Sequence, residues 1–145
     1  MDDILHKSTG VLRYSKDGLN LRLSVCQGIV DLYRDLLPKS IRLNRQAFPA
    51  HISVVRKEVP PRMEFWRKYE GERLDFHYSP VVHHGKVYYW LNAFSTRLEE
   101  VRLELGLPVH SQYTLPPEGF TKCFHITIGN LKCLDIQKEC ESTLY

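Results

Sequence analysis

Hydrophobic residues recur along this chain with two different periods, and these periods divide it into expected helices and strands. Between Leu19 and Leu37 the apolar positions follow helical spacing, which predicts an amphipathic helix that ends before Pro38. A second helix is predicted after Ser95, a residue type favoured at helix N-caps, and Gly106 supplies its C-terminal stop.

Several shorter segments are rich in β-branched or aromatic residues, which is typical of strands. The dipeptide His84-Gly85 predicts a hairpin turn, Met63–Tyr69 a short helix, and Leu107–Phe120 an irregular loop. The predicted strands are Val11–Tyr14, Ile41–Asn44, His51–Val55, Leu74–Tyr78, Val81–Val82, Lys86–Ala93 and Phe124–Ile128. Two helices with about six mostly antiparallel strands predict an α+β fold.

The composition is that of a single compact domain spanning residues 1–145. Residues 1–9 are polar and charged, and no apolar run approaches the roughly 20 residues that cross a bilayer, so we expect no signal peptide and no membrane span. The four cysteines form no C-x-x-C pair, which argues against a zinc ribbon. We therefore expect a cytoplasmic protein with reduced thiols.

Positive charge is concentrated in one region, although the formal net charge is only +3. Residues 39–68 hold eight Lys or Arg side chains against two carboxylates, Glu58 and Glu64, and His51 lies among them. Such a surround attracts an anionic ligand, but a solvated basic face has the same composition.

The tripeptide H-x-[S/T] occurs four times, beginning at His6, His51, His77 and His125. A single match carries no information, so the context of each must separate them. His6 lies in a polar terminus, and His77 in a predicted strand that ends at Pro80, which makes it a competitor. His51 and His125 share a longer pattern in which isoleucine and further β-branched residues alternate with the motif.

Residues i and i+2 of a strand point to one face. His51 and Ser53 therefore face together, as do His125 and Thr127, while the isoleucine within each motif faces the core. Two such strands side by side would place two imidazoles and two hydroxyls around one site. One imidazole can act as base and the other as acid, and the hydroxyls can donate to phosphate oxygens. Two unrelated histidines in two unrelated strands remain the alternative.

Other candidate groups have simpler explanations. Cys123 shares a predicted face with His125 and Thr127, which would suit a nucleophile, but a buried strand cysteine is commoner. His83-His84 would suit a metal, but adjacent strand residues point to opposite faces. No Cys, His or carboxylate cluster has ligand spacing, so we expect neither a metal nor another cofactor.

An aromatic strand offers a surface for a nucleobase. Tyr88, Trp90 and Asn92 alternate onto one face, and the polar Asn92 makes that face the expected side of the site. Stacking of a base on an aromatic ring contributes about 1–3 kcal/mol. A Trp90 that is simply part of the core is the alternative.

The paired motifs resemble those of the two-histidine (2H) phosphoesterase superfamily. The chain from about Gly10 to Lys132 is similar, more narrowly, to the bacteriophage anti-CBASS cyclic-nucleotide phosphodiesterases. The similarity lies in the blocks HISVVR (51–56), WRKYEG (66–71), YYWLN (88–92), ELGLP (104–108) and HITIGN (125–130).

The resemblance implies a bilobal α+β fold with one motif per lobe and a pseudo-twofold relation between them. It implies metal-independent cleavage, in the host cell cytoplasm, of cyclic di- and trinucleotide immune signals such as 3′,3′-cGAMP. The 2′-OH would attack the neighbouring 3′,5′-phosphodiester to give a 2′,3′-cyclic phosphate, which water would open to a 3′-phosphate. Catalytic roles carry over to His51, Ser53, His125 and Thr127, and base-stacking roles to Tyr14 and Trp90.

Two other functions remain open: RNA end processing by a 2′,3′-cyclic phosphodiesterase, and a non-catalytic module that binds nucleotides. The intact pair of motifs argues against binding alone, and the small net charge against a long nucleic-acid partner. We expect a cyclic oligonucleotide as the partner and no membrane. The sequence leaves open which histidine is the base, the oligomeric state and the role of residues after Lys132.

Overall fold

The computed structural model of the protein describes residues 4–16, 19–109 and 122–132. Within these ranges it has six strands, two α-helices and one 3₁₀ turn. In chain order they are β1 (His6–Tyr14), β2 (Asn20–Ser24), α1 (Gln27–Asp35), β3 (His51–Arg56), η1 (Met63–Phe65), β4 (Arg73–His84), β5 (Tyr88–Phe94), α2 (Thr96–Glu104) and β6 (Phe124–Asn130).

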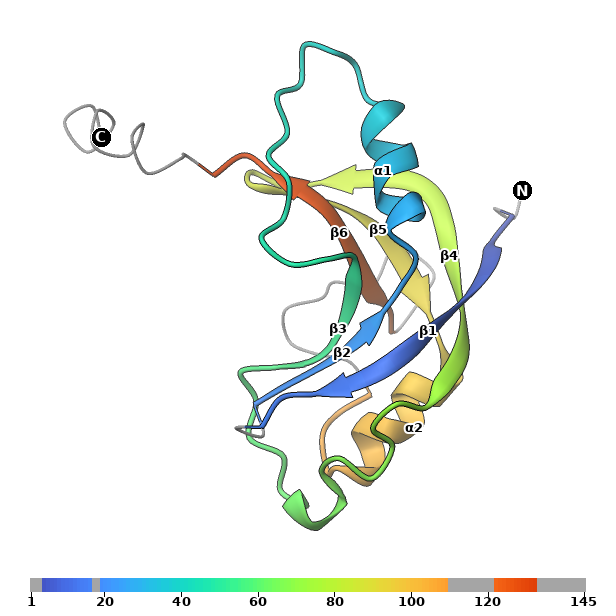
Figure 1. Ribbon diagram of the computed structural model, residues 1–145, viewed down its shortest axis with the longest axis vertical. Coiled ribbons are helices and arrows are strands. Elements are labelled where there is room, and N and C mark those ends of the chain that lie inside the picture. The colour runs from blue at the N-terminus through green and yellow to red at the C-terminus, as the bar shows by residue number, and fades with distance from the viewer. Residues whose placement is uncertain (1–3, 17–18, 110–121, 133–145) are drawn as a thin grey trace, which may run out of the picture.

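The strands pair in the order β1-β2-β3-β6-β5-β4, and β4 returns to β1 to close a barrel in which every pair is antiparallel (Figure 1). The two helices lie at opposite ends of the molecule. The predicted α+β fold with two helices and antiparallel strands is confirmed, and the closure into a barrel is an addition to it.

Apart from η1, the order strand-strand-helix-strand occurs twice. We call β1, β2, α1 and β3 the first half, and β4, β5, α2 and β6 the second half. Equivalent strands pair with each other at both junctions, β1 with β4 and β3 with β6. The two H-x-[S/T] motifs of interest therefore occupy equivalent strands.

The predicted helix over Leu19–Leu37 is wrong in its first part. Residues 20–24 form β2, and the helix begins only at Gln27. Leu21 and Val25 are four residues apart, which suits a helix, but Leu19, Leu21, Leu23 and Val25 also alternate strictly, which suits a strand. Pairing with β1 and β3 decides in favour of the strand.

Two other boundaries also differ from expectation. Ile41–Asn44 is no strand, because it contributes only an isolated bridge between Asn44 and Asn130. The predicted strands on either side of Pro80 are one strand, β4, whose pairing with β5 is irregular between Tyr78 and Val82. Of the predicted loop over 107–120, residues 110–120 lie outside the described residues.

The second helix begins and ends where the sequence predicts. The Ser95 hydroxyl oxygen accepts a hydrogen bond from the backbone N–H of Leu98 at 3.2 Å, which caps α2. Gly106 has φ of +86°, a backbone conformation that favours glycine and ends the helix. None of the helices in the described ranges is long and apolar enough to cross a membrane.

Alternate residues of the strands face a core that also receives the apolar side chains of both helices. In β3, Ile52 and Val54 are fully buried, and in β6 Ile126 and Ile128 are fully buried. Ser53 lies between the two residues of β3 and Thr127 between the two residues of β6. Both are only half-buried and point to the other face of the sheet. That other face therefore carries both motifs.

Candidate active site

The two motifs, His51–Ser53 and His125–Thr127, lie side by side. Strands β3 and β6 pair antiparallel, with Ile52 opposite Ile126. Each histidine is therefore opposite the hydroxyl of the other motif. The two histidines occupy diagonal positions across the strand pair, for which Cα atoms are typically about 7–8 Å apart. On this face His51 lies opposite Thr127 and Ser53 lies opposite His125.

An arginine from each helix holds the strand of the other half. Arg34 of α1 donates to the carbonyl of Ile128 at 3.0 Å, and Arg102 of α2 donates to the carbonyl of Val54 at 2.7 Å. Each of these carbonyls belongs to the residue directly after a motif. A Cβ on Gly129 would overlap the Leu43 side chain and lie 2.6 Å from the Arg34 guanidinium, so a larger residue there would crowd both. The sequence pattern did not reveal either arginine.

His51 is surrounded by a carbonyl and by cations. Its Nδ1 lies 2.8 Å from the carbonyl oxygen of Pro49, which can only accept, so Nδ1 carries the proton and Nε2 keeps its lone pair when the ring is neutral. Burial lowers the pKa of His51 below its ordinary value, and the charges of Arg22 and Arg56 lower it further, against the opposing effect of the Pro49 hydrogen bond.

His125 has an aromatic neighbour instead. The indole of Trp90 lies nearly parallel to its imidazole, with ring centroids 4.9 Å apart and an interplanar angle of 23°. Trp90 is itself held by its Nε1–H, which donates to the Asn92 Oδ1 at 3.1 Å. The imidazole of His83 lies on the β4 side of Trp90, also at 23° and with centroids 6.1 Å apart. Both ring faces of Trp90 are thus turned toward histidines.

Two cavities adjoin the motifs. The larger, of about 540 Å³, reaches His51 and Ser53, and the smaller, of about 280 Å³, reaches His51 and Thr127. Residues 45–48 line both cavities, so this part of the α1–β3 loop forms the wall between them. No Asp or Glu is among the described residues that line the larger cavity, whereas five cations are: Arg22, Arg45, Arg56, Lys57 and Lys132.

These cations also contact neighbouring side chains. Arg45 pairs with Asp31 at 3.1 Å, Lys132 lies over the ring of Tyr88 at 5.0 Å, and Arg22 lies over the ring of Phe48 at 4.2 Å. Arg22 is the partner of Ser53 across the β2–β3 pair, and it was hidden by the incorrect helix prediction. In a helix its direction is unrelated to that of Ser53, whereas in a strand its register places it beside this residue.

The structure separates the predicted base-binding residues into two groups. Trp90 pairs with Thr127 and Asn92 with His125, and Tyr88 lines the larger cavity, so these three belong to the face of the motifs. Tyr14 does not. It is only 7% exposed within the core, its ring contacts Trp66, and burial raises its pKa to about 12. We therefore leave Tyr14 out of the candidate site.

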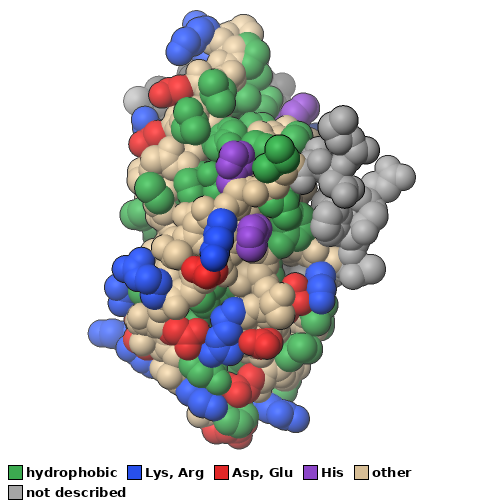
Figure 2. All heavy atoms as spheres, turned by 90° about the vertical axis from the view of Figure 1, so that its right-hand side faces the viewer, with side chains coloured by type: hydrophobic (Ala, Val, Ile, Leu, Met, Phe, Trp, Pro, Cys, Tyr) green, Lys and Arg blue, Asp and Glu red, His purple; other side chains and the backbone are tan. Residues whose placement is uncertain are grey.

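The competing histidines lie elsewhere. His6 and His77 are exposed on β1 and β4, where they pair across strands that do not include β3 or β6. Figure 2 views this side of the molecule and shows histidine side chains at its surface, among hydrophobic and basic ones. Ser79, the hydroxyl of the His77 motif, is 7% exposed, because the irregular pairing of β4 breaks the alternation. His77 and Ser79 therefore do not form a second site.

Two further alternatives are Cys123 as a nucleophile and a metal site. Cys123 is 1% exposed, and burial raises its pKa to about 11, which leaves little of the nucleophilic thiolate at neutral pH. Within residues 4–16, 19–109 and 122–132, no three His, Cys, Asp or Glu side chains are grouped as metal ligands would be.

Comparison with known proteins adds no relative. No model of a protein family matches the chain, and no curated protein or solved structure is detectably similar to it.

Proposed function

We propose that the protein is a metal-independent phosphodiesterase that cleaves 3′,5′ bonds of cyclic di- or trinucleotides by attack of the neighbouring 2′-OH. The observation that carries the proposal is the antiparallel pairing of β3 with β6 around Ile52 and Ile126. It brings two imidazoles and two hydroxyls onto one face, beside a cavity lined by cations. In this proposal the two halves correspond to the two lobes that the sequence resemblance implies.

His51 is the base of the first step. Its Nδ1–H is held by the Pro49 carbonyl, and the Nε2 lone pair is left to accept the 2′-OH proton. The lowered pKa of His51 keeps the ring neutral near pH 7, as a base must be. The new bond forms between the 2′-oxygen and phosphorus.

His125 is the acid of the same step. Its imidazole stacks on the indole of Trp90, a ring type whose face attracts a cation. The proton moves from His125 to the departing 5′-oxygen as the bond between phosphorus and that oxygen breaks. In the second step His125 takes a proton from water as the water oxygen bonds to phosphorus. The bond between phosphorus and the 2′-oxygen breaks, and His51 returns its proton to that oxygen, which leaves a 3′-phosphate.

The hydroxyls and cations stabilise the negative charge that develops on the phosphate. Ser53 and Thr127 lie beside the histidines and can donate hydrogen bonds to the non-bridging oxygens. Arg22 and Arg56 share the larger cavity with Ser53 and supply positive charge to it. The reaction type rests on this geometry, and the substrate class rests on the sequence resemblance.

A panel of substrates in EDTA separates this proposal from its alternatives. The protein is incubated with 3′,3′-cyclic dinucleotides and with 2′,3′-cyclic mononucleotides, and the products are resolved by chromatography. We expect cyclic dinucleotides to be converted, through a 2′,3′-cyclic phosphate, into linear products with a 3′-phosphate. Opening of 2′,3′-cyclic phosphates alone would indicate RNA end processing, and binding without turnover would indicate a nucleotide-binding module.

A further inference from the structure

The base of a bound nucleotide needs an aromatic face that is open, and Trp90 does not provide one. It lies on β5 between β4 and β6, and it stacks on His83 from one neighbour and on His125 from the other. A base stacked on Trp90 would compete with these two rings. Trp90 is thus better suited to orienting His125 than to binding substrate.

Phe48 has the opposite properties. It is 56% exposed, although large aromatic side chains are usually buried. It lies in the wall between the two cavities and lines both. The Arg22 guanidinium lies 4.2 Å from its ring centroid, and the His51 ring meets it edge-on at 6.5 Å. An exposed aromatic ring therefore lines a basic cavity next to His51, the proposed catalytic base.

We propose that Phe48 is the platform on which the nucleobase of the substrate stacks, while its phosphate lies over His51 and Arg22. The inference rests on the proposed function for the class of ligand, a nucleotide, and adds where its base binds. Arg22 fixes the Phe48 ring from one side by a cation–π contact, and the remaining ring surface is open to a base. A π-face accepts any base, so this contact supplies affinity more than base selection.

The surrounding residues fit this ligand. Gln46 lies two positions before Phe48 in the same wall, and its Oε1 accepts from Asn130 Nδ2 at 2.6 Å, which orients the amide N–H groups away from that contact. Asn20 and Asn44 also line the larger cavity. These amides can donate to and accept from the edge of a base, whereas the cations serve the phosphate.

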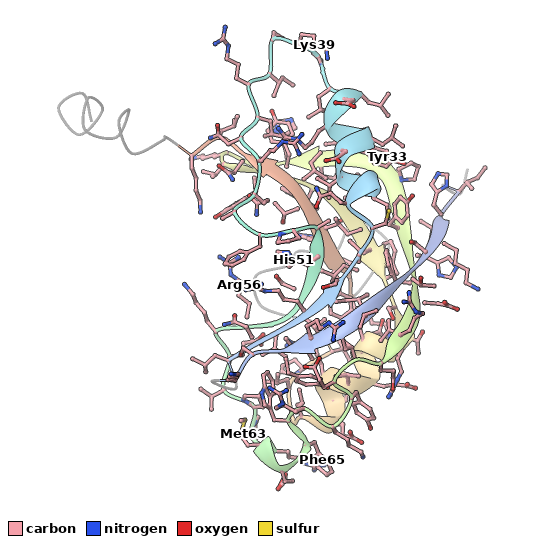
Figure 3. The ribbon with its side chains drawn as sticks, in the orientation of Figure 1. Tyr33, Lys39, His51, Arg56, Met63 and Phe65 are labelled. Carbon is pink, nitrogen blue, oxygen red and sulfur yellow. The ribbon has the colours of Figure 1, made fainter. Side chains whose placement is uncertain are left out.

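The test measures binding, so it does not depend on turnover. The probe is adenosine 3′-monophosphate, which contains a base and a phosphate but no scissile diester, and inorganic phosphate is the base-free probe. Affinities of the wild type and of the Phe48→Ala, Phe48→Leu and Phe48→Tyr variants are measured by NMR titration. Phe65→Leu is the matched control, because Phe65 also carries a cation, Lys68, at 5.1 Å but lies at the far end of the molecule (Figure 3).

We expect Phe48→Ala to weaken nucleotide binding roughly 5- to 150-fold, the equivalent of about 1–3 kcal/mol for one stacked base, and to leave phosphate binding unchanged. Phe48→Leu should lose most of this affinity and Phe48→Tyr should keep it, as should Phe65→Leu. Wild-type affinity in Phe48→Ala or Phe48→Leu overturns the inference, as does an equal loss for inorganic phosphate, which would mean that Phe48 acts only through Arg22. A wild type that binds no adenosine 3′-monophosphate also overturns it.

Failure of this inference and failure of the proposed function give different results. If Phe48→Ala cleaves cyclic dinucleotides and binds nucleotide as tightly as the wild type, only the base platform is refuted. If the wild type cleaves no cyclic dinucleotide but Phe48→Ala still loses nucleotide affinity, the base platform stands and the proposed catalysis is refuted.

Discussion

The two halves of the protein carry the same motif on equivalent strands, but the neighbours of the motif differ. In the first half β2 presents Arg22 beside β3, whereas in the second half β5 presents Trp90 at the equivalent position beside β6. A cation disfavours a protonated imidazole and an indole face favours one. In the proposed mechanism, two halves with the same order of elements but unequal neighbours thus supply a base and an acid from two copies of one motif.

The supporting arginines differ between the halves as well. Arg34 donates to the backbone carbonyls of Leu43, Asn44 and Ile128 and is half-buried. Arg102 is fully buried and forms two hydrogen bonds of 2.9 Å with the carboxylate of Glu58, besides its bond to Val54. Burial alone would raise the pKa of Glu58, but the hydrogen bonds and charge of Arg102 outweigh this and lower it. Arg102 therefore forms a buried ion pair with Glu58, whereas Arg34 has no ion pair with the residues that the structure describes.

The largest expected effect comes from removing either imidazole. His51→Ala and His125→Ala should each lower kcat by about 10²–10⁴-fold while the fold persists, because each removes one proton-transfer group. Single-turnover cleavage of a cyclic dinucleotide measures this, and His77→Ala is the matched control. Near wild-type turnover in either variant, or an equal loss in His77→Ala, would refute the assignment.

The arginines should differ in their contribution to stability. Arg102→Leu leaves Glu58 without its partner, and we expect a loss of about 3–5 kcal/mol in the free energy of unfolding. Arg34→Leu removes hydrogen bonds to neutral carbonyls only and should cost less. Urea denaturation followed by circular dichroism measures both. An equal loss in the two variants would show that the buried ion pair does not distinguish the halves.

The two hydroxyls should act alike despite their different surroundings. Ser53→Ala and Thr127→Val should each lower kcat by up to about 10²–10³-fold, since their hydrogen bonds strengthen as charge develops on the phosphate. Steady-state kinetics on each variant separate kcat from KM. A change in KM alone would mean that the hydroxyls bind substrate and transition state equally well.

The smallest effect concerns the cations beside His51. The lowered pKa of His51 places the acidic limb of the kcat/KM profile below pH 6.5. Arg22→Gln removes a charge that lowers this pKa, so the limb should move to higher pH by less than about one unit, which is under about 1.4 kcal/mol. Lys57→Gln is the control, because Lys57 lines the same cavity but has no part in the shift. A limb that stays in place or moves to lower pH would contradict the role of Arg22.

The sequence predicts those parts of the fold in which local pattern and tertiary pairing agree. The strand around His51, the strand around His125 and the helix capped by Ser95 all belong to this class. In each motif the isoleucine faces the core and the histidine does not, as alternation requires. What the pattern cannot supply is which strands pair, because pairing depends on contacts between distant residues.

The misplaced parts have one physical cause in common. Leu21 and Val25 satisfy both periods, so local pattern alone could not choose between helix and strand, and the position of Arg22 was lost with that choice. Tyr14 and Phe48 show the same limit for aromatic residues. Composition does not distinguish a ring that packs in the core from one in a loop that borders a cavity, since the difference arises from the whole fold.

The most direct test of the central claim is the cleavage of 3′,3′-cGAMP in EDTA, compared with its analogue that has 2′-deoxyriboses at both positions. A 2′-OH held in line with phosphorus makes the attack intramolecular, which contributes up to about 7–11 kcal/mol for ideal geometry. We predict that the ribose compound is opened through a 2′,3′-cyclic phosphate and that the deoxy analogue stays intact although it binds. Cleavage of both compounds at similar rates would contradict the account, because water and not the 2′-OH would then be the nucleophile.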